Sequence, residues 1–285
     1  ISIASFYQNN IERAFFHHFL KGPADGKTGL PEAYLFDTGT KVWRQYDRWP
    51  LPQAARKMLY FQAGGKLSFD KPTTKASFTD YISDPAKPVP YSEDLRQMSG
   101  FTPFDYMSED QRFAASRPDV LVFQTDPLTE DITLGGELMA KLRFSTTGTD
   151  ADFFVKLIDV YPDDEPNHPY LTDKKVILAG YQQMVRSEIM RARFRESFSK
   201  PTPLKANQLT TLDFALQDVL HTFKKGHRIM VQVQSTAFPL FDRNPQKYVP
   251  NIYKAEAQDF SKATHRIYHA AEAASGLEVQ VVSNP

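Results

Sequence analysis

The sequence of 285 residues contains no cysteine, which excludes disulfides, thiolate metal sites and a cysteine nucleophile. Its 34 basic residues balance its 34 acidic residues, so no net charge is available to hold a nucleic-acid backbone or an anionic membrane. It also lacks any run of about 18 apolar residues of the kind that spans a bilayer. We therefore expect neither a nucleic-acid nor a membrane partner.

Apolar residues make up 41% of the chain, which is enough for a sizeable core in one large or two modest domains. From about Asn9 they recur at intervals of three and four residues, which predicts an amphipathic helix that ends at Gly22-Pro23. The apolar positions are Ile11, Ala14, Phe15, Phe16, Phe19 and Leu20. This is the only long helix that the sequence predicts.

After Pro31 the pattern changes to short apolar runs separated by turn residues, which is typical of an all-β sandwich. The predicted strands are 33–36, 41–46, 58–62, 120–125, 138–145, 153–161, 212–216 and 277–281. In 153–161 the apolar residues fall on both parities, which predicts a strand covered on both faces. Between the first two strands, Gly39 stands where a hairpin turn can require a positive φ.

Residues 225–245 join a predicted strand to a loop braced by two prolines. Apolar residues alternate between positions 229 and 233, as in a strand with one face on a core. His227, Ser235 and Asp242 have the composition of a catalytic triad, but the first two lie at opposite ends of one strand, roughly 27 Å apart. We interpret this segment as a core strand and a corner of the sandwich, without catalytic chemistry.

Several motifs along the chain keep the order that they have in one group of enzymes. They are Val42-Trp43-Arg44-Gln45-Tyr46-Asp47-Arg48-Trp49-Pro50, Asp84-Pro85-Ala86-Lys87-Pro88-Val89-Pro90-Tyr91, Asp110-Gln111-Arg112-Phe113, Arg117-Pro118-Asp119-Val120-Leu121, residues 149–162, Arg193-Phe194-Arg195-Glu196-Ser197-Phe198, residues 225–245 and Val249-Pro250-Asn251-Ile252. With these landmarks, residues 6–282 closely resemble the C-terminal region of the α-amino-acid ester hydrolases and glutaryl-7-aminocephalosporanic acid acylases. The cocaine esterases and X-Pro dipeptidyl-peptidases are more distant relatives.

The resemblance implies a jelly-roll β-sandwich of the galactose-binding-like kind, which in these enzymes packs on an α/β-hydrolase domain with a Ser-Asp-His triad. It divides the chain into residues 1–26, a helix left from the hydrolase domain, and residues 27–285, the C-terminal non-catalytic domain. None of the 13 glycines opens the G-x-S-x-G elbow that presents the nucleophile. We therefore expect the chain to begin just after the family's catalytic histidine and to hold no catalytic residue, metal or cofactor.

The segment 84–118 is rich in proline and aromatic residues and is too long for a routine connection. In the family that the chain resembles, the corresponding loop approaches the mouth of the active site. By that resemblance we expect Phe101, Phe104 and Tyr106 to form part of the rim of the substrate pocket. The alternative is that they cover the end of the sandwich. Without a catalytic domain, this surface and the apolar face of the first helix should be partly exposed.

Four histidines invite a catalytic or metal interpretation that the pattern does not support. His17 and His18 lie inside the predicted helix, whereas a triad histidine needs a loop over the nucleophile. His265 and His269 have the spacing of a helical zinc motif, but the H-E-x-x-H glutamate and a third ligand are missing. We expect neither His17 nor His18 to be a triad base, and neither His265 nor His269 to bind a metal.

Other polar residues favour structural roles. His227 follows a turn glycine, and we expect it to bond to the backbone, whereas His168 and His221 have no recognisable partner. The acidic residues 163–165 match no calcium loop and are interpreted as a solvated turn. Three arginines on predicted strands are expected to form structural pairs with nearby carboxylates. These arginines are Arg193, Arg195 and Arg228, and their candidate partners are Asp159, Glu196 and Asp242.

The resemblance therefore implies the non-catalytic part of a serine hydrolase of the ester hydrolase, β-lactam acylase or X-Pro dipeptidyl-peptidase type. Its expected partner is an upstream α/β-hydrolase domain, and we expect a homo-oligomer through the first helix and residues 91–112. Two alternatives are a stand-alone carbohydrate-binding module, in which Trp43 and Trp49 stack on sugars, and an assembly module. The resemblance favours a periplasmic or secreted location, while the absence of cysteine also allows the cytoplasm.

Overall fold

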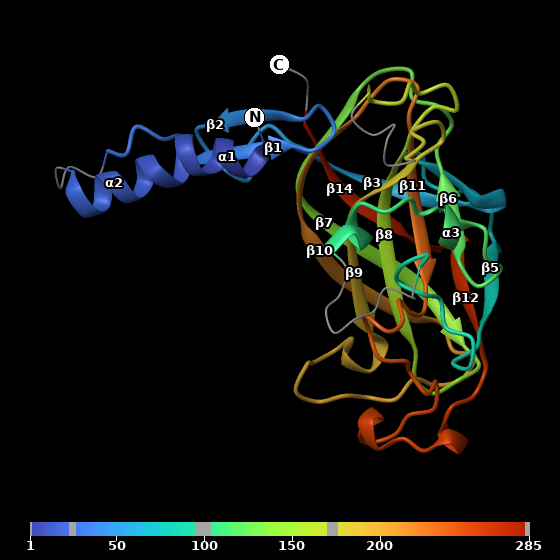
Figure 1. The fold of residues 1–285 in the computed structure, drawn as a ribbon. Coiled ribbons are helices and arrows are strands. Elements are labelled where there is room, and N and C mark those ends of the chain that lie inside the picture. Colours follow the sequence, from blue (N-terminus) through green and yellow to red (C-terminus); the bar gives the residue numbers. More distant parts are fainter. Residues whose placement is uncertain (1, 23–26, 95–103, 170–175, 283–285) are drawn as a thin grey trace.

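The structure, a computed structural model, describes residues 2–22, 27–94, 104–169 and 176–282. It consists of an arm and a β-sandwich, and Figure 1 shows the arm projecting from one end of the sandwich. The arm comprises α1 (Ile3–Tyr7), a π-helical turn (Gln8–Glu12), α2 (Arg13–Lys21) and a hairpin of β1 (Ala33–Asp37) and β2 (Val42–Tyr46). Among the described helices, none is long and apolar enough to cross a membrane.

The sandwich contains the remaining strands and one short helix, α3 (Arg112–Ala115). The strands are β3 (Ala55–Gln62), β4 (Lys66–Ser68), β5 (Phe78–Ser83), β6 (Leu121–Gln124), β7 (Ile132–Thr146), β8 (Asp152–Val160), β9 (Gln182–Arg191), β10 (Thr210–Phe223), β11 (Arg228–Gln234), β12 (Ala263–Ala270), β13 (Ala273–Ala274) and β14 (Gly276–Val282). This arrangement confirms the predicted all-β sandwich preceded by a helix.

The strands form two groups that pack face to face. In the first group β7 pairs with β10 on one edge and with β14 and β12 on the other, and β3 follows β14. In the second group the order is β6, β11, β8 and β9. β4 pairs with β3 and joins the second group at β6. Core contacts cross between the groups, because Phe144 meets Phe153 at 4.5 Å and Phe61 stacks on Phe123 at 4.1 Å between ring centroids.

β8 lies in the middle of the second group, and all of its residues except Val160 are buried. Phe153, Val155 and Leu157 point into the main core. Phe154, on the opposite face, packs with Tyr91, with Tyr106 and with the loop 237–241. The prediction of a strand covered on both faces is confirmed. The covering loops are those that the sequence marks as unusually aromatic or proline-braced.

The helix of the arm begins earlier than predicted, because Ser2 caps it and its Oγ accepts the Ser5 N–H at 3.1 Å. Phe6 then stacks on Trp43 of the hairpin at 5.0 Å, which holds α1 against β1 and β2. No residue of α2 is buried. Its apolar side chains Phe15, Phe16, Phe19 and Leu20 are 45–75% exposed, as the sequence predicts for a helix without its partner.

Asp37 connects the hairpin to the sandwich. This buried carboxylate accepts the N–H of Gly39 at 3.0 Å and both the N–H and the hydroxyl of Thr222 in β10, at 3.0 and 2.7 Å. The prediction that Gly39 has a positive φ is wrong. The residue with a left-handed φ in this turn is Lys41, at 60°. Gly39 is needed because a Cβ there would overlap the Thr222 carbonyl.

Five strands of the sandwich, β4, β5, β9, β12 and β13, are absent from the sequence prediction. Conversely, the motif that begins at Arg193 is not a strand, because Ala192–Phe194 form a 3-10 helix and a turn follows. In β12 the inward positions include His265 and His269, so polar residues occupy the core parity and hide the alternation. The i,i+4 spacing of these histidines therefore spans a strand, which separates them by about 13 Å.

Candidate functional site

The predicted rim residues lie partly outside the described structure. Phe101 belongs to the undescribed residues, and Phe104 begins a 3-10 helix, Phe104–Met107. Tyr106 is half-buried and meets the ring of Tyr91 at 5.5 Å in an edge-to-face contact. It packs with Phe154 of β8 in a small apolar cluster on the outer face of the sandwich. Tyr106 therefore lies on this face, next to β8 and β9.

Polar contacts below the rim hold residues 104–112 on the sandwich. The Gln111 N–H donates to the Gln182 carbonyl at 3.0 Å, and its side chain accepts from the Lys156 ammonium at 2.8 Å. Lys156 is almost fully buried in β8, and burial lowers the pKa of its ammonium to about 7, although the Glu109 carboxylate acts in the opposite direction. The Tyr181 hydroxyl donates to the Ser108 carbonyl. The loop is thus tied to two neighbouring strands.

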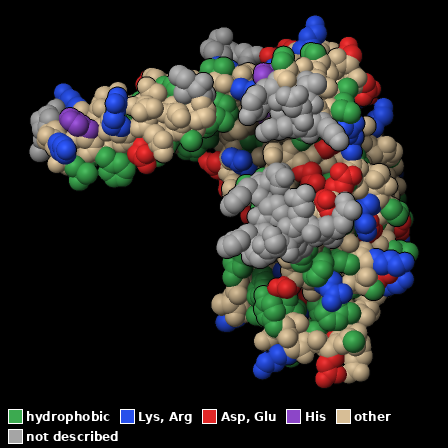
Figure 2. Space-filling view, in the orientation of Figure 1, with side chains coloured by type: hydrophobic (Ala, Val, Ile, Leu, Met, Phe, Trp, Pro, Cys, Tyr) green, Lys and Arg blue, Asp and Glu red, His purple; other side chains and the backbone are tan. Residues whose placement is uncertain are grey.

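Three adjoining hollows follow β9 and together form what we call the β9 groove. The arm hollow, about 510 Å³, is lined by Phe6 and Trp43 and shares Thr38 with the middle hollow. The middle hollow, about 340 Å³, contains Tyr106, and the large hollow, about 820 Å³, extends to the far end of β9. Figure 2 shows hydrophobic side chains gathered on the lower part of this face and along the arm. The groove therefore runs from the arm past the rim.

The loop after β11 forms a wall of the groove, which the sequence interpretation missed. Leu240 and Phe241 line both the middle and the large hollow, and Phe241 packs on Phe154 at 5.6 Å between ring centroids. The sequence does contain a signal for this wall, because Leu240 and Phe241 lie on a loop between two prolines. Apolar residues on a loop can form a binding surface and need not belong to the core. Ser235, at the start of this loop, bonds to the Tyr81 hydroxyl at 2.8 Å instead of joining a triad.

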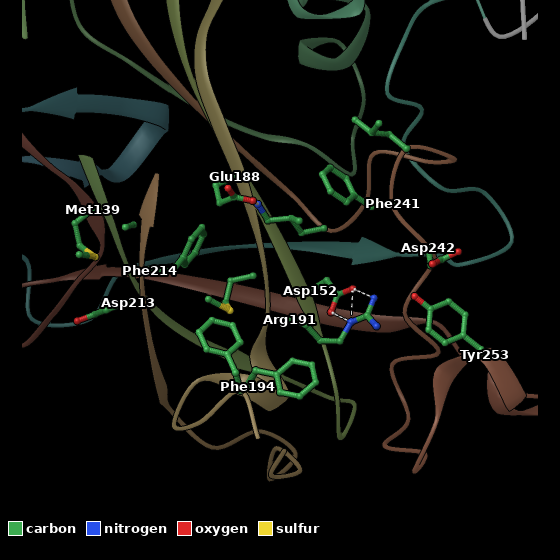
Figure 3. A pocket seen from close by; sticks show the side chains of 15 residues that line it. Met139, Asp152, Glu188, Arg191, Phe194, Asp213, Phe214, Phe241, Asp242 and Tyr253 are labelled. Atoms are coloured by element: carbon green, nitrogen blue, oxygen red, sulfur yellow. Dashed lines mark hydrogen bonds and ion pairs between the residues drawn. The ribbon is translucent and has the colours of Figure 1, made fainter. Parts of the chain in front are cut away.

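An ion pair between the half-buried Arg191 and the buried Asp152 lies in the wall of the large hollow. Arg191 of β9 donates to Asp152 of β8 from Nε at 3.0 and 3.1 Å and from Nη2 at 2.9 Å, and the Asn244 amide donates to the same carboxylate at 2.7 Å. Burial raises the pKa of Asp152 to about 6, although Arg191 and Asn244 favour the charged form. Figure 3 shows this pair between Phe194 on one side and Glu188 and Phe241 on the other.

The histidines at the opposite end of β8 form a structural network. Asp159 accepts from His221 at 3.1 Å and from His227 at 2.8 Å, and His221 also meets the Thr38 hydroxyl at 2.8 Å. Burial raises the pKa of Asp159, but the two histidine hydrogen bonds outweigh it and lower the pKa. The expectation that His227 bonds to backbone and that His221 has no partner is wrong. Asp159 was predicted to pair with an arginine, but its carboxylate bonds to these two histidines instead.

The three arginines of the sequence prediction do form structural contacts, largely with other partners. Arg193 pairs with Asp150 at 2.7 Å, and Arg228 donates to the Thr125 carbonyl at 2.9 Å. Arg195 lies 3.4 Å from Glu196, its predicted partner, and also donates to backbone carbonyls. Because Arg193 lies in a 3-10 helix and Arg195 follows that helix, the strand positions predicted for these two arginines were wrong.

The remaining candidates supply no metal or sugar site. His269 bonds to Ser77 and Thr79 at 2.8 and 3.0 Å, and burial lowers the pKa of His265 to about 3. Across the described ranges, no three His, Asp or Glu side chains are placed to hold a metal ion. Trp43 stacks on Phe6, and the Trp49 indole donates to Asp218 at 3.0 Å, so both tryptophans make contacts within the chain.

Comparison with known proteins decides the family of this sandwich. Residues 25–278 match the family described as the X-Pro dipeptidyl-peptidase C-terminal non-catalytic domain. The chain belongs to this family. The C-terminal non-catalytic domain is also similar to cocaine esterase from Rhodococcus sp. (strain MB1 Bresler), with 31% identity over 95% of the chain and 45% of that protein.

Two solved structures share both sequence and fold with this C-terminal domain. An aminopeptidase from a marine sediment archaeon, Thaumarchaeota archaeon, has 41% identity and a TM-score of 0.90, covering 99% of the chain and 45% of that protein. An α-amino acid ester hydrolase has 42% identity and a TM-score of 0.87, covering 98% and 45%. The chain thus spans about half the length of the proteins it matches. These matches do not favour the stand-alone carbohydrate-binding or assembly alternative.

Proposed function

We propose that this domain serves a serine hydrolase by docking on an α/β-hydrolase catalytic domain and by forming part of its acyl pocket. The observation that carries the proposal is the β9 groove. It places Tyr106, Leu240 and Phe241 on one face with the arm, in which the apolar side chains of α2 are not buried against any described residue. A contiguous apolar surface of this kind is typical of an interaction site.

The proposal assigns residues 1–26 to the last helix of the catalytic domain and residues 27–285 to the non-catalytic domain. Two observations support this division. No residue of α2 is buried against the sandwich, and the family match starts at residue 25. The helix would then be a link through which the two domains share a hydrophobic interface.

In the proposed whole enzyme, a serine of the catalytic domain attacks the acyl carbonyl, with histidine as general base, and water then releases the acyl group. The substrates would be esters or amides, by likeness to the α-amino acid ester hydrolase and the aminopeptidase. Tyr106, with Phe101 and Phe104 of the same loop, would shape the acyl side of the pocket. The residues described here would contribute packing and no reacting group.

A chimera tests this role. Residues 1–285 replace the corresponding segment of the α-amino acid ester hydrolase, and the product is assayed with a series of aminoacyl esters. We expect activity in the chimera, a KM raised several-fold with little change in kcat for Tyr106→Ala, and no change for Tyr60→Ala, a half-buried tyrosine in β3 outside the groove.

The isolated chain is a negative control for the activity of the chimera. Mixed with an activated ester such as p-nitrophenyl acetate, residues 1–285 should give no burst of product. A stoichiometric burst from the chain alone, or equal effects of the Tyr106 and Tyr60 substitutions in the chimera, would contradict the proposal.

Self-association of the isolated chain is a second expectation, since the apolar face of α2 is exposed. Sedimentation should show a concentration-dependent dimer or larger species. The double substitution Phe16→Ser and Phe19→Ser should abolish it. The control Ile82→Ser, an apolar residue of similar exposure in β5, should leave it unchanged. A monomer at all concentrations would refute oligomerisation through the arm.

A further inference from the structure

We propose that the large hollow of the β9 groove binds a small organic ammonium ion that carries an aromatic or aliphatic body. The inference goes beyond the proposed function and does not rest on it, because every group that it uses belongs to this chain. It depends on three features of the hollow, which are its aromatic lining, its excess of carboxylates and its volume.

Aromatic rings line the hollow from several elements of the chain. Phe194 and Phe198 stack at 6.3 Å between centroids, and Phe214 of β10 and Phe241 complete the apolar surface. Tyr253 lies beside Asp242 at the rim (Figure 3). Phe198 and Tyr253, which lines the hollow from the 3-10 helix Ile252–Lys254, are 77% and 78% exposed, so both side chains are largely open to solvent. Rings that are open on one face can receive a cation or an apolar body.

The charges of the hollow do not cancel. Its lining contains four carboxylates and one guanidinium, and Arg191 is already paired with Asp152. Asp213 is paired with Arg143 at 2.7 Å, which lies outside the lining. These two pairs leave the carboxylates of Glu188 and Asp242, for which the described residues provide no ion pair.

The neighbours of these two carboxylates are engaged elsewhere. Glu188 accepts only the N–H of Ile189, at 2.9 Å, among the contacts in the described ranges. Arg243 follows Asp242 in the chain, but its guanidinium donates to the Pro85 carbonyl at 2.7 Å and lies over the ring of Phe260. Arg243, the basic residue next to Asp242 in the chain, is therefore engaged away from the hollow. Arg186, two residues before Glu188, lines the middle hollow and donates to the carbonyls of Asp218 and Val185.

A ligand that suits this hollow has one positive charge and an apolar body. Carboxylates and ring faces both attract an ammonium ion, whereas an anion would meet the unpaired charges of Glu188 and Asp242. The volume of about 820 Å³ is within the range of pockets that hold small ligands. A neutral ligand of the same shape would gain the apolar contacts but not the electrostatic attraction.

Methionine methyl groups allow a direct test on the 285-residue chain, because Met139 and Met190 line the hollow. The chain is labelled with ¹³C-methyl methionine and titrated with phenethylammonium, and then with 2-phenylethanol and phenylacetate. We expect saturable shifts of the Met139 and Met190 signals, with Met58 of β3 unaffected, and affinity in the order cation, neutral, anion. The cation should bind roughly fivefold to tenfold more tightly than the alcohol.

Substitutions separate charge from packing. The variant with Glu188→Gln and Asp242→Asn should lose the preference for the cation, and the Phe198→Ala and Tyr253→Ala pair should weaken both ligands. Glu272→Gln, which removes one charge outside the hollow, should change neither. Unaltered thermal unfolding would show that the exposed substitutions leave the fold intact. Absence of saturable shifts, equal affinity for amine and alcohol, or stronger binding of a neutral sugar would overturn the proposal.

Discussion

The sandwich buries its apolar residues, whereas the helix α2 of the arm leaves its apolar residues exposed. In the sandwich, β8 is buried along its whole length except for Val160, and large side chains meet across the core. In the arm, α2 has a regular apolar stripe and buries no residue. Since helices derive most of their stability in proteins from packing an apolar face, the stripe on α2 indicates a partner surface. Apolar residues therefore mark an internal core in the sandwich and an external contact surface in the arm.

The largest expected effect comes from removing matched phenylalanines from the two regions. Phe144 is fully buried, whereas Phe19 is 57% exposed. Phe144→Ala should lower the free energy of unfolding by about 3–5 kcal/mol, because it leaves a cavity against Phe153. Phe19→Ala should change it by less than about 0.5 kcal/mol. Urea unfolding of the two variants measures both. A comparable loss in each would show that α2 is packed within the isolated chain.

An intermediate effect is expected at the junction between arm and sandwich. Asp37→Ala removes the acceptor for the Thr222 N–H and hydroxyl and for the turn at Gly39. The unsatisfied buried donors should cost about 2–4 kcal/mol in urea unfolding. Asp80→Ala, which removes a half-exposed ion pair with Arg266, should cost less than about 1 kcal/mol. Equal losses would mean that Asp37 does not tie the hairpin to β10.

A pH-dependent effect, smaller than the preceding ones over any single pH unit, is expected beneath the rim. The pKa of Lys156 is about 7 in the fold and 10.5 in the unfolded chain, so unfolding takes up a proton between these values. The free energy of unfolding should therefore rise with pH from 7 to 10, by at most about 1.4 kcal/mol per unit. Lys156→Met should remove this rise, whereas Lys57→Met, at an exposed position, should retain it. Parallel pH profiles for wild type and Lys156→Met would contradict the assignment.

Most strands of the core could be predicted because burial on one or both faces leaves a readable pattern. β7, β8, β10 and β11 carry apolar residues at core positions, and the sequence predicts β8 and β11 closely but only 138–145 of β7 and 212–216 of β10. β12 was not predicted, because two of its buried positions are occupied by His265 and His269 and not by apolar residues. Periodicity cannot anticipate such substitutions, because the partners of His269 lie about 190 residues away in sequence.

Fewer residues of the candidate site than of the fold could be predicted from the sequence. Tyr106 was singled out through family resemblance, but Leu240 and Phe241 were assigned to a corner of the sandwich. Their position in the groove depends on packing against Phe154, a contact that joins segments far apart in the chain. β9 was missed for a related reason: nearly all its residues are half-buried, because one face lines the groove.

Hydrogen exchange tests the central claim most directly, which is that the arm and the β9 groove are docking surfaces for a catalytic domain. The amides of α2 and of Phe104–Met107 are compared between the isolated chain and the chimera with the α-amino acid ester hydrolase catalytic segment. We predict fast exchange at these sites in the isolated chain and strong protection in the chimera, with β8 protected in both. Unchanged exchange in α2 and at the rim of an active chimera would contradict the account.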